Sequence, residues 1–159
     1  MRYFQDPKGE TYGYDESDST QQPYIKAALA AAWGEVTGNW PPAPTLFEAQ
    51  VSQSSALSDA CSAAVVAGFT SSALGSTNTY PSDVATQGNI DRAAVHGGTI
   101  WCESSAGAWS LTQHTAAQAL QVQADLWTHI QICQSKLATL KAQVAAATTV
   151  SAVEAVIWS

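Results

Sequence analysis

The chain has 159 residues and a formal net charge of −7, and only 12% of its residues are charged. The acidic balance argues against nucleic acid as a partner, because phosphates select a basic face, and against binding to an anionic membrane surface. Alanine, glutamine, serine and threonine occupy many of the surface positions that charged residues usually take. We therefore expect one domain, or a domain with a small N-terminal extension, in a protein that works inside an assembly.

The three cysteines, Cys61, Cys102 and Cys133, are widely spaced, and none belongs to a CxxC pair. An odd number at such spacing fits neither a disulfide framework nor a zinc site, so we expect buried thiols in a reducing compartment. The opening MRYFQDPKGE has no apolar region of the kind that signal peptides carry. No apolar run approaches the about 20 residues that a membrane span needs. We expect synthesis in the cytoplasm and no membrane partner.

Residues 1–40 predict an adaptor that consists of a β-hairpin and a short helix. The arms RYFQ and ETYGY flank the sequence DPKG, whose proline and glycine suit a tight turn. An isolated two-stranded hairpin is marginal in water, so it must pack on something. We expect Tyr3, Tyr12 and Tyr14 to contact a partner protein. The helix follows at about residues 25–33.

The proline-rich residues 41–45 predict a stiff linker that can be neither helix nor central strand. Thr45 and Glu48 then form a capping box that opens a helix, and Gly68 ends it. We expect this helix to bury a stripe that consists of Phe47, Val51, Leu57, Cys61, Ala64 and Val65.

The segment after this helix predicts a loop that is closed by Pro81, with Ser82 as the N-cap of a short helix to about Val95. The glycine pair at 97 and 98 stops that helix. The run TIWCESSAGAWSLT then predicts a second hairpin, with Trp101 and Trp109 on its arms.

The longest predicted element is a helix from Thr115 to Ala147, which opens with a capping box of Thr115 and Gln118. Its length of about 45 Å is more than the core of so small a protein covers entirely. An apolar seam runs along it through Val122, Leu126, Ile130, Cys133, Leu137, Leu140 and Val144. A last helix near Thr149 predicts an antiparallel helical hairpin with the long one.

Leu120 and Trp127 lie one heptad apart and form a second apolar strip beside the seam. One interpretation packs this strip on the hairpin or on the last helix, and the other exposes it to a partner, because tryptophan is common among interface hot spots. We expect the partner to contact Leu120, Trp127, Leu137, Leu140 and Val144. A carbohydrate platform of exposed aromatic rings is a third interpretation.

These elements predict an α+β, mainly α fold with an N-terminal β-hairpin, a Pro-rich linker and a helical body. The body carries a long C-terminal helical hairpin and a small embedded β-hairpin. We expect three parts, at residues 1–40, 41–45 and 46–159.

No constellation of residues predicts catalysis, a cofactor or a metal site. His114 and His129 are separated by four helical turns, so they cannot share one metal without a third element. Asp125 and His129 are spaced for a surface pair on the helix. Cys133 follows His129 by four residues but falls on the apolar seam, which favours a core thiol over a nucleophile. The run GFTSSALG lacks the GK[ST] ending of a phosphate loop.

Residues 57–158 resemble the C-terminal domain of tail-fibre assembly-type proteins of tailed bacteriophages. The most specific pieces are GFTSSALG with the following YPS and QGN, and the helix start HTAAQ. The opening MRYFQDPKGETYGY and the segment GNWPPAPT are similar to the start of such proteins. The sequence departs from the family at Asn78, where family members often carry a histidine before the Tyr-Pro pair.

The resemblance implies a non-enzymatic structural protein of the virion tail, assembled in the host bacterial cytoplasm. It would bind the tail fibre and attach or stabilise it at the tail or baseplate, with other tail proteins or further copies of itself as partners. One alternative is a transient tail-fibre assembly chaperone that is absent from the mature virion. A second alternative is a receptor-binding or glycan-binding module.

Overall fold

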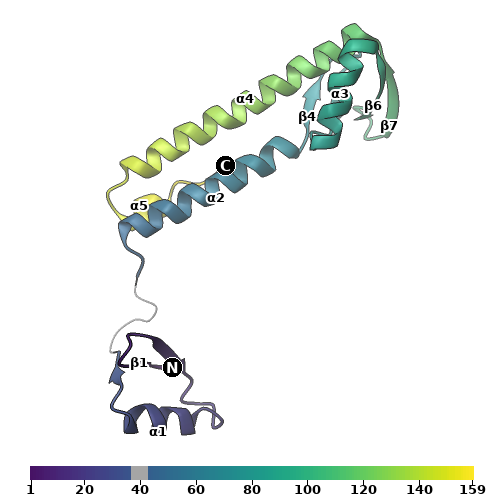
Figure 1. The fold of residues 1–159 in the computed structure, drawn as a ribbon. Helices are drawn as coiled ribbons and strands as arrows, with labels where there is room; N and C mark the ends of the chain where they lie inside the picture. Colours follow the sequence, from purple (N-terminus) through teal and green to yellow (C-terminus); the bar gives the residue numbers. More distant parts are fainter. Residues whose placement is uncertain (37–42) are drawn as a thin grey trace. The chain divides into compact units, whose positions relative to one another are not determined.

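A computed structural model describes residues 1–36 and 43–159 of the chain (Figure 1), which divides into two compact units, Met1–Pro44 and Thr45–Ser159. Part of the predicted linker at 41–45 lies outside the described residues. In the part that is described, no helix is both long and apolar enough to cross a membrane.

The first unit is a three-stranded antiparallel sheet with one helix. The strands β1 (Arg2–Gln5), β2 (Thr11–Tyr14) and β3 (Gly34–Glu35) have the order β2-β1-β3, and α1 spans Gln22–Ala30. The turn between β1 and β2 is fixed by Asp6, whose carboxylate accepts the backbone N–H groups of Lys8 and Glu10. Gly9 closes this turn with a φ of +88°, which a residue with a side chain adopts only with strain.

A small core closes the first unit. Phe4 from the central strand is buried against Ile25 and Ala28 from α1, with Trp33 packed beside them. The guanidinium of Arg2 donates two hydrogen bonds, of 2.7 and 2.6 Å, to the carboxylate of Glu35. The hairpin therefore packs on its own helix and gains a third strand.

The second unit contains all the longer elements. Its helices are α2 (Leu46–Val66), α3 (Val84–His96), α4 (Ala116–Ala146) and α5 (Val150–Glu154). Its strands β4 (Phe69–Ser71), β5 (Asn78–Tyr80), β6 (Gly98–Glu103) and β7 (Trp109–His114) form one antiparallel sheet in chain order. Both predicted capping boxes are present, at Thr45 with Glu48 and at Thr115 with Gln118.

The second unit holds two clusters of buried side chains, and α4 contributes to both. Figure 1 shows α2 and α4 side by side, with the sheet and α3 at one end of the pair and α5 at the other. The core at the sheet end contains Phe69, Tyr80, Ile90, Ile100, Val122 and Leu126 among others. The core at the α5 end contains Ala49, Leu57, Val144 and Val153. The predicted seam of α4 is thus covered mainly by the chain itself.

The predicted fold class, α+β and mainly α with two small hairpins, is wrong. The structure is a mixed arrangement of helices and strands with two antiparallel sheets. The predicted loop after α2 contains β4 and β5, and these three-residue strands are too short to show alternation in the sequence. The long C-terminal helical hairpin is also wrong, because α5 has only five residues and α4 packs along α2 instead.

Two local assignments differ from the structure for identifiable reasons. Asp83, not Ser82, is the N-cap of α3, since its carboxylate accepts the N–H groups of Ala85 and Thr86. The stripe predicted on α2 is also incomplete, because Phe47 and Val51 are exposed.

Candidate functional site

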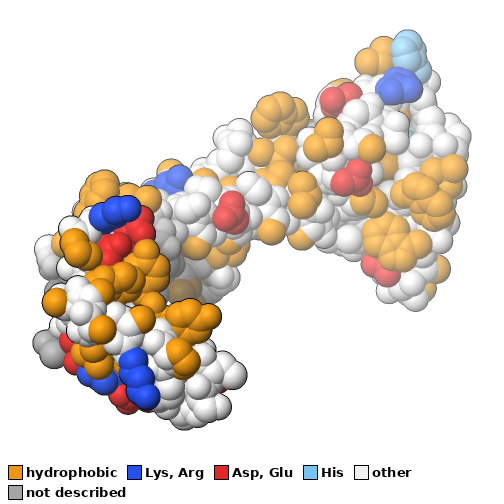
Figure 2. All heavy atoms as spheres, turned by 60° about the horizontal axis from the view of Figure 1, so that its bottom comes forward, with side chains coloured by type: hydrophobic (Ala, Val, Ile, Leu, Met, Phe, Trp, Pro, Cys, Tyr) orange, Lys and Arg blue, Asp and Glu red, His pale blue; other side chains and the backbone are white. Residues whose placement is uncertain are grey.

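The outer face of α4 has few charged residues and exposes large apolar side chains. Between Asp125 and Lys136 the helix contains no charged residue, over almost three turns. Exposed helix faces normally carry charged side chains. Here the exposed side chains include Trp127, of which 57% is accessible, and Ile132, of which 61% is accessible. Figure 2 shows that, in its view, few Lys, Arg, Asp or Glu side chains appear over the second unit.

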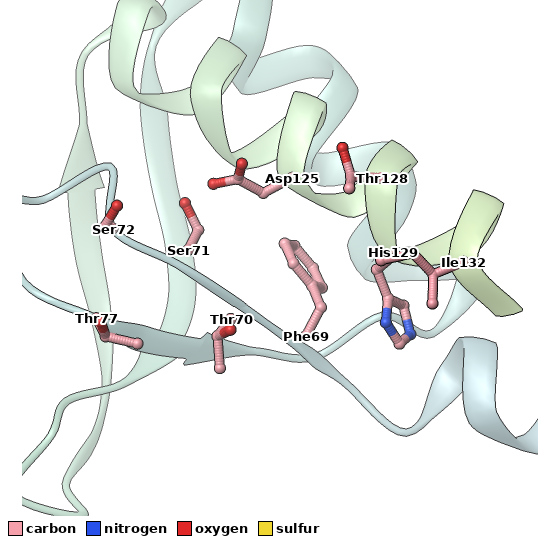
Figure 3. A pocket seen from close by; sticks show the side chains of 9 residues that line it. All are labelled: Phe69, Thr70, Ser71, Ser72, Thr77, Asp125, Thr128, His129 and Ile132. Atoms are coloured by element: carbon pink, nitrogen blue, oxygen red, sulfur yellow. The ribbon is translucent and has the colours of Figure 1, made fainter.

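Two adjoining hollows flank this face. A shallow groove of about 490 Å³ is lined by Trp127, Thr128, Gln131, Ile132 and Ser135. Thr128 and Ile132 also line a second hollow of about 500 Å³, which lies between α4 and the segment of β4 (Figure 3). Because the two hollows share side chains, they form one continuous surface, which we name the α4 face.

Phe69 forms the apolar floor of the second hollow. Figure 3 shows its ring between Asp125 and His129 on one side and the residues of β4 on the other. The ring stacks on the imidazole of His129 at 6.2 Å and on Tyr80 at 5.6 Å between centroids. Ser71, Ser72 and Thr77 give the far wall a polar lining.

Two polar side chains that line this hollow, Asp125 and His129, bond to the protein itself. The carboxylate of Asp125 accepts a 2.9 Å hydrogen bond from the amide of Gln121. The imidazole of His129 bonds to the backbone carbonyl of Ala64 at 3.1 Å through Nε2. No direct hydrogen bond or ion pair joins Asp125 and His129, so the pair that their spacing suggested does not form.

His129 and Cys133 are close, but they are not arranged as base and nucleophile. The Sγ of Cys133 lies 3.9 Å from Nε2 of His129. A carbonyl oxygen can only accept, so Nε2 must carry its proton in order to bond to Ala64. It then has no lone pair with which to take a proton from the thiol. Among residues 1–36 and 43–159, no group of three or more His, Cys, Asp and Glu side chains could hold one metal ion.

The structure separates the predicted contact residues of α4 into two groups. Leu120 and Trp127 are exposed on the outer face. Leu137, Leu140 and Val144 pack into the core with α2 and α5, and Val144 is fully buried. Only the first group is accessible to a partner without rearrangement.

Tyr3, Tyr12 and Tyr14, which were predicted to contact a partner, each contact other residues of the first unit. The ring of Tyr12 packs on Trp33 at 5.1 Å, and its hydroxyl bonds to Glu10. Tyr14 packs on Phe4 and stacks on Tyr24. The hydroxyl of Tyr3 lies 3.0 Å from the sulfur of Met1. Tyr12 and the exposed ring of Tyr24 remain accessible at the surface.

Sequence analysis did not identify Phe69 or Ile132 as part of the site. Ile132 falls outside the seam, so its spacing does not mark it. The sequence feature that could have indicated it is the uncharged stretch between Asp125 and Lys136. Phe69 falls in the segment that the sequence predicts as a loop after α2, whereas in the structure it opens strand β4.

One family model matches the chain. It describes a domain of unknown function, DUF4376, and it matches residues 48–157. The chain belongs to this family. No curated protein and no solved structure matches the chain. The DUF4376 match lies entirely within the second unit and contains every residue of the α4 face.

Proposed function

We propose that this DUF4376 protein is a non-enzymatic component of a bacteriophage tail, which binds the tail fibre through the α4 face and attaches or stabilises it at the tail or baseplate. The resemblance of residues 57–158 to tail-fibre assembly-type proteins supports the viral context. The observation that carries the binding role is the exposed Trp127 beside Ile132, in the middle of an uncharged stretch of helix.

Exposed apolar side chains on a helix stabilise a complex when a partner covers them. Burial of apolar surface contributes about 25 cal/mol per Å², before the costs of association are subtracted. A tryptophan provides the largest area of any side chain and is enriched among residues that dominate binding energy. The groove beside Trp127 provides space for an anchoring side chain of the partner.

An amphipathic helix of the fibre protein is the segment that this surface suits best. Such a helix presents apolar side chains at spacings of three, four and seven residues. Leu120 and Trp127 are seven residues apart on α4, and Trp127 lines the groove together with Ile132. Because α4 has no charged residue between Asp125 and Lys136, the partner residues that meet this stretch need not be charged either.

The first unit would serve as the adaptor to a neighbouring tail or baseplate protein. Its exposed aromatic side chains, Tyr12 and Tyr24, are the contacts that we propose for this role. This arrangement would give the protein one unit for each partner.

Co-expression with the tail-fibre protein, followed by size-exclusion chromatography, tests the proposal. We expect the native chain to co-elute with the fibre protein, and the double variant Trp127→Ala/Ile132→Ala to elute separately. Phe47→Ala is the matched control, since Phe47 is also an exposed aromatic side chain on a helix but lies outside the α4 face. Unchanged co-elution of the double variant would contradict the proposal.

A transient assembly chaperone would bind the fibre through the same surface as a tail component. The two roles therefore differ in whether the protein is present in the mature virion. Mass spectrometry of purified virions should detect the protein if it remains attached to the fibre. Its absence from virions, together with fibre binding in solution, would assign it to the chaperone class.

A further inference from the structure

A third hollow in the second unit has a different chemistry from the α4 face. It is a groove of about 440 Å³ between α3 and the hairpin of β6 and β7. Asn89, Arg92 and His96 line one side, and their spacing of three and four residues places them on one face of α3. The side chains of Trp101 and Leu111 line the other side.

The strand side of the groove is an exposed apolar platform. Trp101 on β6 is directly opposite Leu111 on β7, so both side chains project from the same face of the sheet. Trp101 is 52% accessible, whereas tryptophan side chains are highly buried on average. Glu103 and Trp109 form the next pair on this face, but neither lines the groove.

Gly97, which lines the groove, lies close to the backbone of residues 114–116. A Cβ atom at this position would lie 3.1 Å from the carbonyl oxygen of His114 and 3.3 Å from the nitrogen of Ala116. Gly97 also has a φ of +71°, which favours glycine. These two constraints allow α3 to pass directly into β6, and they bring the polar side chains of the helix beside the indole.

The polar groups of the groove have no partner in the part of the chain that the structure describes. Asn89, Arg92 and His96 make no side-chain hydrogen bond or ion pair there. Asp91, the acid next to Arg92 in the chain, instead accepts a hydrogen bond from Gln123 of α4. Arg92 is one of only three Lys or Arg residues in the second unit, and the whole chain is acidic. A free guanidinium in such a chain is complementary to a single anionic group.

We propose that this groove binds an acidic sugar, with the carboxylate on Arg92 and the apolar face of the sugar ring on Trp101. A guanidinium binds a carboxylate through two parallel hydrogen bonds. The amide of Asn89 and the imidazole of His96 can both donate and accept, which suits the hydroxyl groups of a sugar. The volume of the groove falls in the range of small-molecule sites.

A phosphorylated ligand suits the groove less well. One arginine balances one carboxylate, whereas a nucleotide phosphate carries more charge and is usually bound by several cations or a glycine-rich loop of backbone N–H groups. The stacking surface would accept a base, so a nucleotide is the competitor that an experiment must include.

Titration of the ¹⁵N-labelled full chain, followed by NMR, tests the proposal. The probes are N-acetylneuraminic acid, glucuronic acid and galacturonic acid, with glucose, galactose and AMP as comparisons. We expect at least one acidic sugar to shift the indole N–H signal of Trp101 and the amide signals of Gly97 and Gly98. Its affinity should exceed that of the neutral sugars and of AMP at least tenfold.

Three variants separate the groove from the rest of the surface. Trp101→Ala should weaken binding of that sugar at least tenfold, and Arg92→Gln, which removes the positive charge, should remove its preference over a neutral sugar. Trp109→Ala is the control, because Trp109 is 49% accessible on the same sheet face but does not line the groove. It should bind the sugar as the native chain does.

Several results would overturn the proposal. These are the absence of any shift up to about 10 mM acidic sugar, equal binding of neutral sugars, tighter binding of AMP, or equal losses in Trp101→Ala and Trp109→Ala. Fibre binding by Trp101→Ala should remain native, so failure of this proposal leaves the role of the α4 face untouched.

Discussion

The hydroxyl of Tyr80 lies 2.9 Å from Nε2 of His114 in the interior of the second unit, where neither side chain is exposed to solvent. Nδ1 of the same imidazole bonds to the carbonyl of Thr112 at 2.8 Å and must therefore carry a proton. Nε2 is then the acceptor, and the hydroxyl of Tyr80 is the donor. This bond joins β5 to β7 across the strand that separates them.

Tyr80→Phe should destabilise the second unit, because it leaves Nε2 of His114 buried without a donor. An unsatisfied buried acceptor costs about 1–3 kcal/mol. Urea unfolding, followed by circular dichroism, measures the difference in the free energy of unfolding. Tyr3→Phe in the first unit is the control for loss of a tyrosine hydroxyl, and it should leave unfolding of the second unit unchanged.

The same tyrosine predicts a loss of stability at alkaline pH. Burial raises the pKa of Tyr80 well above its ordinary value, and the neighbouring Cys102 raises it further. Between the pKa of the unfolded chain, about 10, and the higher pKa of the folded state, the unfolded chain binds fewer protons. The contribution of Tyr80 is therefore complete below pH 10 and falls as pH rises above it.

Unfolding experiments from pH 8 to pH 12 measure this dependence. The free energy of unfolding should decrease above pH 10 in the native chain and decrease less steeply in Tyr80→Phe. Parallel curves for the two proteins would show that Tyr80 titrates in the folded state as it does in the unfolded chain.

Ser82 and Asp83 are adjacent and have different roles, which substitution should separate. The hydroxyl of Ser82 is fully buried, donates to the carbonyl of Val65 at 2.6 Å and accepts from the N–H of Gly68 at 2.9 Å. Ser82→Ala should therefore cost about 2 kcal/mol or more, because two buried backbone groups lose their partner. Asp83→Ala removes an exposed N-cap and should have a smaller effect.

Acid pH should reduce the difference between Asp83→Ala and the native chain. Hydrogen bonds from Thr86 lower the pKa of the Asp83 carboxyl below its ordinary value. Its stabilising contribution is present above the unfolded pKa of about 4 and is lost as pH falls through the lower folded value. The effect of Ser82→Ala should persist over the same range, which thermal unfolding at pH 7 and pH 2.5 can measure.

The pair Ser82 and Asp83 also shows what the sequence could and could not predict. Capping boxes at Thr45 and Thr115 were recognisable because each consists of two residues at a fixed spacing next to an apolar run. A serine and an aspartate side by side are both good N-caps, so only the backbone direction distinguishes them. The bond from Ser82 to Val65 depends on residues 17 positions apart, and no local pattern contains it.

The α4 face illustrates the same limit at the level of the site. The period of the seam indicated a long helix, and α4 begins and ends within one residue of the predicted bounds. The seam alone did not indicate which element covers it, because α2 had been assigned a stripe through Phe47 and Val51. The structure places Leu137, Leu140 and Val144 against α2 and α5, and this tertiary choice determines which predicted contacts stay accessible.

The cysteines should be unreactive in the folded chain. Cys61, Cys102 and Cys133 are all buried and free. Burial raises the pKa of the Cys61 thiol, and the neighbouring Cys133 raises it further. Since only the thiolate reacts, iodoacetamide at pH 8 should modify these residues slowly in native buffer and rapidly in urea, which mass spectrometry can measure. Rapid native modification of Cys61 would show that α2 and α4 separate readily at that point.

Leu126 and Trp127 are neighbours on α4, but the first is buried and the second is exposed. Their substitution should therefore change the free energy of unfolding by very different amounts. Leu126 is buried in the core with Phe69 and Ile90, so Leu126→Ala should lower the free energy of unfolding by about 2–5 kcal/mol. Trp127 projects from the α4 face, and exposed positions away from caps and networks usually change stability by less than about 0.5 kcal/mol. Urea unfolding of the isolated protein measures both values. A loss of several kcal/mol in Trp127→Ala would place the indole in the fold of the chain itself, and the α4 face would then have no exposed anchor for a fibre helix.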